Sequence, residues 1–90
     1  MKPLNSGFTN KLVDVTPAVA ASILERNFNN RSLDARRVDM FARIIADGEF
    51  DKRLGSIILD ADGNLLNGQH RLNAVVKSGC TVTINVKQKI

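Results

Sequence analysis

One stretch of this 90-residue chain carries most of the residues that could do chemistry, and it reads Asn67-Gly68-Gln69-His70-Arg71. Gly68 permits a sharp change of direction, because glycine adopts backbone angles that other residues avoid. Apolar residues precede the stretch, and others follow it at the i, i+3, i+4 spacing of an amphipathic helix, namely Leu72, Val75 and Val76. The pattern therefore predicts a strand, a tight turn and a helix that begins beside His70 and Arg71.

A turn of this kind suits an anion. Backbone N–H groups of Gly68, Gln69 and His70 would lie at the positive end of the helix, with the Arg71 guanidinium beside them. His70 is the only histidine of the chain, and its imidazole can act as acid, base or hydrogen-bond donor near neutral pH. No cysteine, serine or second histidine is close to it in sequence, so nucleophilic catalysis is not favoured. An alternative interpretation stays open, in which Gly68 is only a turn residue and Arg71 only forms an ion pair at the surface.

Two further groups of residues are candidates for binding a ligand or a metal ion. Asn30 and Arg31 end an asparagine-rich segment just before a predicted helix, where they would suit an anion or a sugar hydroxyl, or would simply connect two helices. Asp60 and Asp62 are interpreted as turn residues, because they lack the further oxygen ligands that a calcium loop needs. No metal site is predicted.

Composition narrows the classes of function. A net charge of +4 and a pI of about 9.7 permit phosphate-bearing partners. The positive charges are scattered apart from one run (Arg31, Arg36, Arg37 and Arg43), which favours an anionic ligand over extended duplex DNA. Four Phe, with no Trp or Tyr, argue against a base-stacking platform. The single cysteine, Cys80, excludes an intramolecular disulfide and is expected to be a small buried apolar residue.

The N-terminus has no apolar segment typical of a signal peptide, and no apolar run reaches the length of a membrane span. A cytoplasmic protein with no membrane partner is therefore expected. Ninety residues bury only a thin core, so association into a homodimer would help to stabilise the domain.

The elements follow from hydrophobic periodicity and capping signals. Residues 1–10 are expected to be a loose lead-in and residues 11–90 a single domain. The predicted elements are a strand at Leu12–Thr16, a helix from the Thr16 cap to about Arg26, a Ser32-capped helix ended by Gly48, a hairpin with arms at 57–59 and 65–66, a helix to Ser78 and a strand at Thr81–Val86. Residues 87–90 are expected to be a tail.

This order, β-α-α-β-β-α-β, predicts the α+β class, with a small mixed sheet and three packed helices. The second helix has apolar residues at the i, i+3, i+4 spacing, namely Val38, Phe41, Ile44 and Ile45. Leu33 and Arg37 stand one turn before them. The first helix is expected to turn Val19 and Ile23 inward. The predicted core comprises Val38, Phe41, Ile45, Ile57, Leu65, Leu72, Val75 and Val82.

The segment Leu65–Ala74 resembles the Gly-x-(His or Arg)-Arg-x-x-Ala box of the ParB/sulfiredoxin superfamily. It is particularly similar to the version found in ParB-like N-terminal domains and in small stand-alone members, many of them phage-encoded. Residues 29–33 and 38–43 resemble the segment before that box in the stand-alone members. The resemblance covers about residues 12–87.

The resemblance implies a ParB/sulfiredoxin-like fold and a phosphate site at Gly68, Gln69, His70 and Arg71, with Asn67, Asn30 and Arg31 nearby. By similarity the ligand would be a nucleotide, CTP or ATP with magnesium. Sulfiredoxins carry a catalytic cysteine where this chain has Gln69, so sulfinic-acid reductase activity is not expected. ParB proteins continue into a helix-turn-helix domain, and this sequence contains no such DNA-binding module, although association with nucleic acid stays open.

Three functions therefore remain after the sequence has been read. The favoured one is a ParB-like domain that binds a nucleotide or another phosphate-bearing ligand. The second is a nuclease or phosphotransferase with His70 as catalytic acid or base. The third is a protein-interaction module in which the box serves only as a turn.

Overall fold

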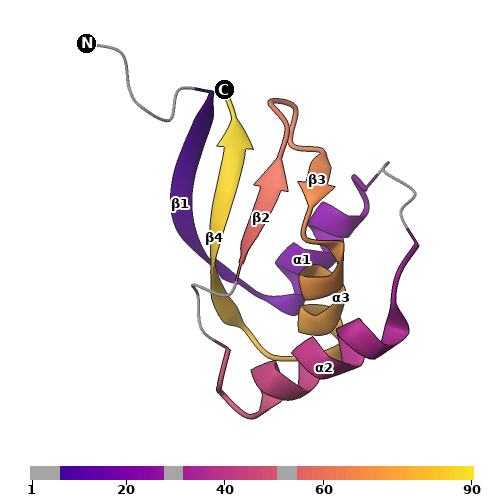
Figure 1. Ribbon diagram of the computed structural model, residues 1–90. Coiled ribbons are helices and arrows are strands. Elements are labelled where there is room, and N and C mark those ends of the chain that lie inside the picture. The colour runs from indigo at the N-terminus through magenta and orange to yellow at the C-terminus, as the bar shows by residue number, and fades with distance from the viewer. Residues whose placement is uncertain (1–6, 28–31, 51–54) are drawn as a thin grey trace.

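The computed structural model describes residues 7–27, 32–50 and 55–90 (Figure 1). Its elements in chain order are β1 (Phe8–Val15), α1 (Pro17–Leu24), α2 (Ala35–Ala46), β2 (Ser56–Leu59), β3 (Leu65–Asn67), α3 (Gln69–Ser78) and β4 (Val82–Lys89). The predicted order of elements is confirmed. So is the α+β class, with a four-stranded mixed sheet and three helices in this part of the chain.

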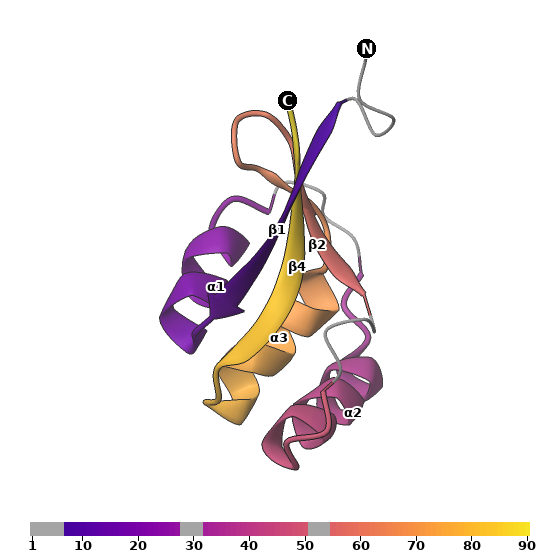
Figure 2. The ribbon, with the colours of Figure 1, turned by 90° about the vertical axis from the view of Figure 1, so that its left-hand side faces the viewer.

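The sheet has the strand order β1-β4-β2-β3. The central strand β4 runs antiparallel to β1 and parallel to β2, and β2 pairs antiparallel with β3. Helix α3 packs between α1 and α2, as Figure 2 shows. Lys77 of α3 also forms an ion pair with Asp39 of α2. Because β3 leads directly into α3, the Gly68 turn joins the sheet to the helix that packs against both of the others.

Two strands are longer than their sequence pattern predicts. Strand β1 begins at Phe8, within the expected lead-in, and β4 continues to Lys89, within the expected tail. The two extensions pair with each other, from Phe8 opposite Lys89 to Asn10 opposite Lys87. Polar residues hide the alternation in both segments. The extension of β4 also pairs with β2, with Lys87 opposite Ile58 and Gln88 opposite Leu59.

The helix starts follow local capping rules, with one correction. Thr16 caps α1 as predicted, since its hydroxyl accepts a hydrogen bond from the Val19 N–H at 3.1 Å. The cap of α2 is Asp34 and not Ser32: its carboxylate accepts from the N–H groups of Arg36 and Arg37 at 3.0 and 3.4 Å. A carboxylate at this position also complements the positive end of the helix.

The core matches the predicted set closely. Seven of the eight predicted residues are buried, namely Val38, Phe41, Ile45, Ile57, Leu65, Leu72 and Val75. The eighth, Val82, is half-buried against the core, and so is Cys80. Two expected inward residues, Val19 and Val76, are exposed instead, at 38% and 43%. Ala20 and Ala74 are fully buried in the same helices, so small side chains occupy the packed faces of α1 and α3.

The β2–β3 hairpin turns on Asp60, as its sequence predicts. One carboxylate oxygen of Asp60 accepts from the N–H groups of Asp62 and Asn64 at 2.9 and 2.8 Å, and the other accepts from the Asn64 side chain at 3.1 Å. The pKa of Asp60 is lowered from its ordinary value of 3.8, chiefly by the backbone hydrogen bond from Asn64. Hydrogen bonds to the charged form explain this direction.

Because the folded-state pKa of Asp60 is lowered, its stabilising effect is present above the ordinary pKa of 3.8 and is lost as pH falls through the folded value. We expect Asp60→Asn to lower the free energy of unfolding at pH 7, and we expect the difference from wild type to shrink as pH falls below 3.8. Urea unfolding between pH 2 and 7 checks this. A difference that stays constant across that range would contradict the role given to the carboxylate.

Candidate functional site

The candidate site is built on the Gly68 turn, where β3 passes into α3. Gly68 is the N-cap residue of α3 with φ at 114°, a left-handed conformation that side chains rarely adopt. A Cβ atom there would lie 2.6 Å from Cδ1 and 3.3 Å from Cα of the buried Ile57. Both conformation and space therefore require glycine. Since glycine offers no capping side chain, the first N–H groups of α3 receive no cap from this residue.

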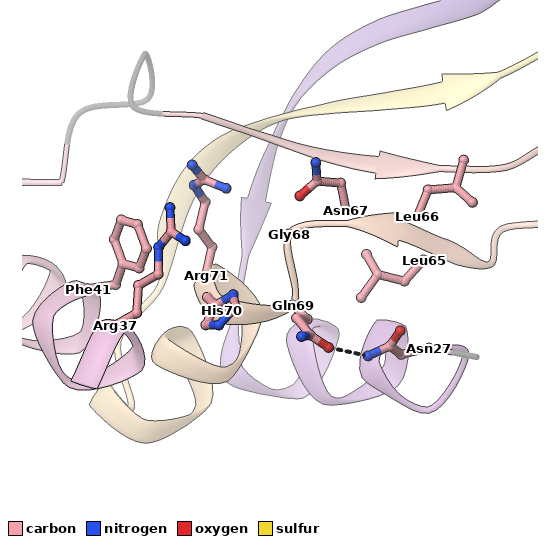
Figure 3. A pocket seen from close by; sticks show the side chains of 10 residues that line it. All are labelled: Asn27, Arg37, Phe41, Leu65, Leu66, Asn67, Gly68, Gln69, His70 and Arg71. Atoms are coloured by element: carbon pink, nitrogen blue, oxygen red, sulfur yellow. Dashed lines mark hydrogen bonds between the residues drawn. The ribbon is translucent and has the colours of Figure 1, made fainter. Parts of the chain in front are cut away.

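A cavity of about 260 Å³ opens beside this turn (Figure 3). Its walls come from the segment after α1, from α2, from β3 and from the start of α3. It is lined by Asn27, Arg37, Phe41, Leu65, Leu66, Asn67, Gly68, Gln69, His70 and Arg71. Among these described lining residues two are arginines and none carries a carboxylate, so they contribute positive charge to the cavity.

Two guanidinium groups from different helices face this cavity. Figure 3 shows Arg37 of α2 and Arg71 of α3 lying side by side. The Arg71 guanidinium lies over the ring of Phe41, 5.2 Å from its centroid, in a cation–π contact. Burial lowers the pKa of Arg71 from its ordinary value, and the positive charge of Arg37 lowers it further. An anion between the two arginines would offset the repulsion between their charges.

Gln69 connects the ends of two segments around the cavity. Its side-chain oxygen accepts from the Asn27 amide at 2.9 Å, and its side-chain nitrogen donates to the Ser32 carbonyl at 3.4 Å. Asn27 follows α1 and Ser32 precedes α2. Gln69 thus acts as a structural tie between α3 and both neighbouring helices.

His70 makes a defined contact with α2. Its Nε2 accepts a hydrogen bond from the Asp34 N–H at 3.0 Å. An accepting Nε2 carries no proton, so the neutral ring has its proton on Nδ1. In this arrangement Nε2 is occupied by the backbone at the N-cap of α2, and only Nδ1 remains for any proton transfer.

The contact of His70 with Asp34 predicts a structural effect of mutation. We expect His70→Ala to lower the free energy of unfolding by about 1 kcal/mol, because the Asp34 N–H loses its acceptor. His70→Gln, which can present an acceptor oxygen, should recover part of that loss. Guanidinium unfolding followed by circular dichroism measures both variants. An alanine variant as stable as wild type would show that the hydrogen bond contributes nothing.

The structure brings together five of the seven predicted ligand-binding residues, Asn67 to Arg71, around one cavity. The other two, Asn30 and Arg31, lie outside the described residues. Sequence reasoning missed Arg37, Phe41 and Asn27 as lining residues. The signal for Arg37 was present, since it stands one turn before Phe41 on the apolar side of an amphipathic helix.

Comparisons with protein-family models, with curated proteins and with solved structures found no match to this chain. Among the helices of residues 7–27, 32–50 and 55–90, none has the length and hydrophobicity that a membrane span requires.

Proposed function

We propose that this protein is a ParB-like domain that binds a phosphate-bearing ligand of the nucleotide class in the cavity at the Gly68 turn. The observation that carries the proposal is the convergence of Arg37 and Arg71, from two helices, on one cavity. Arginine forks recognise phosphate oxygens in a bidentate manner. The start of α3 adds backbone N–H groups and the positive end of a helix beside them.

The resemblance of Leu65–Ala74 to the ParB/sulfiredoxin box supports the nucleotide class. The phosphates would lie against the Gly68 turn and the two arginines. Asn27 and Asn67 also line the cavity, and their side chains would contact the polar atoms of a sugar or base. Catalysis by His70 gains no support from the geometry, because its Nε2 accepts from the Asp34 N–H.

Calorimetric titration tests the proposal. CTP, ATP and inorganic pyrophosphate are each titrated into the protein with and without magnesium, and thermal unfolding is recorded in parallel. We expect at least one of them to bind with one-to-one stoichiometry and to raise the melting temperature. A ligand at 100 times its Kd should stabilise the fold by about 2.7 kcal/mol. No heat and no thermal shift with any of them at millimolar concentration would contradict the proposal.

A further inference from the structure

We propose that Gly55 is a positioning residue of the candidate site, because its missing side chain leaves the space in which the Arg71 guanidinium is held at the cavity. This inference rests on the proposed function. It names a residue that does not itself line the cavity but on which the affinity for a phosphate-bearing ligand depends. It follows from the contacts that Arg71 makes with two segments distant from it in sequence.

Gly55 stands directly before β2, and Arg71 occupies the place where a side chain at this position would lie. A Cβ atom there would overlap Nη2, Cζ and Nε of Arg71, each at less than 3.0 Å. Atoms that are not bonded to each other do not approach so closely, so either the guanidinium or the start of β2 would have to move. The observed position of Arg71 therefore requires glycine at position 55.

The Phe41 ring holds the same guanidinium from α2. The Arg71 Cζ lies 5.2 Å from the centroid of this ring. Phe41 is a buried residue of the core, so its ring is fixed by packing. The lowered pKa of Arg71, which burial causes in the first place, agrees with a guanidinium partly enclosed by protein. Arg71 thus belongs to α3, while its charged end is held by α2 and by the residue that precedes β2.

This arrangement would favour binding by fixing Arg71 in advance. An arginine side chain has several rotatable bonds, and a ligand that has to order such a side chain binds more weakly. Arg71 already lines the cavity in its held position, so the ordering occurs on folding and not on binding. A side chain at position 55 would displace the guanidinium without removing its charge. Gly55 therefore controls the geometry of the site and not its charge.

Calorimetry with ATP and with CTP tests the inference. We expect Gly55→Ala to weaken the tighter of the two nucleotides by at least about fivefold. In an Arg71→Ala background the same substitution should change the affinity by less than about twofold, because the displaced group is absent. Gly48→Ala is the matched control, since a Cβ atom at Gly48 would meet nothing within 4 Å, and it should keep the wild-type affinity. Equal weakening by Gly55→Ala in both backgrounds would overturn the inference.

NMR of the ligand-free protein observes the guanidinium directly. The ring current of Phe41 shifts the Nε–Hε signal of Arg71, which is assigned by its loss in Arg71→Ala. Gly55→Ala should move this signal and Gly48→Ala should not. An unmoved signal in Gly55→Ala would overturn the inference. If Gly55→Ala does not fold, the double variant with Arg71→Ala should fold, because the space is then vacated, and failure of both to fold would likewise overturn it.

The outcomes separate this inference from the proposed function. Nucleotide binding by the wild type with an unchanged affinity in Gly55→Ala would overturn the inference alone. Failure of the wild type to bind any phosphate compound would overturn the proposed function, and with it the role of Gly55 in binding. The NMR signal would in that case still report whether Gly55 positions the guanidinium.

Discussion

Replacing Phe41 with alanine is expected to lower the free energy of unfolding by about 3–5 kcal/mol. The Phe41 side chain is only 8% exposed and belongs to the core between the sheet and the helices. The same ring carries the Arg71 guanidinium on its face. Alanine would leave a cavity in the core and remove that support. Urea unfolding followed by circular dichroism measures the loss.

Two variants make the Phe41 prediction specific. Met40 precedes Phe41 on α2 and is 50% exposed, so Met40→Ala should change stability by no more than about 0.5 kcal/mol. Phe41→Leu keeps an apolar side chain and should lose much less stability than alanine, while it removes the ring under Arg71. If Phe41→Ala were as stable as Met40→Ala, the packing of α2 described above would be wrong.

Arg71→Ala should weaken a phosphate ligand by roughly ten- to a hundredfold. The expected loss corresponds to charge-assisted hydrogen bonds that contribute about 1.5–3 kcal/mol. Arg71→Lys should lose less, because lysine keeps the charge but not the planar fork. Neither variant should unfold the protein, since Arg71 lies at the cavity and not within the apolar core. Calorimetry with the tightest-binding nucleotide gives these affinities.

The control for Arg71 is Arg36→Ala, which lowers the net charge equally and lies outside the cavity. Salt should weaken wild-type binding only modestly, because the ligand presents few phosphates and not a nucleic-acid backbone. If the affinity of Arg71→Ala matched that of Arg36→Ala for every phosphate ligand, the Gly68 turn would be reduced to a structural role.

Features governed by a few neighbouring residues were predictable from the sequence. Thr16 and Pro17 precede apolar residues at helical spacing, and this combination predicts the start of a helix. Gly68 also precedes apolar residues at helical spacing, and its conformational freedom predicts a turn there. The apolar spacing around Phe41 and Leu72 likewise identified the core. These signals depend on residues that are close together in sequence, so the elements can be predicted without the tertiary structure.

Features that depend on a partner distant in sequence were not predictable. The segments beginning at Phe8 and ending at Lys89 form strands because they pair with each other across 81 positions of sequence. The sequence places Arg37 in a run of arginines, but its convergence with Arg71 on one cavity depends on the packing of α2 against α3. The roles of Gln69 and His70 as ties to Asn27 and Asp34 also appear only in the folded chain.

The central claim is that a phosphate-bearing ligand binds at the Gly68 turn between Arg37 and Arg71. A titration of the ¹⁵N-labelled protein with ATP and with CTP, followed by two-dimensional NMR, tests both binding and location. The account predicts that the largest amide shifts fall on Gly68, Gln69, His70 and Arg71, with Arg37 on α2 also affected. Shifts confined to the exposed residues of β1 and β4, or no shifts at millimolar nucleotide, would contradict it.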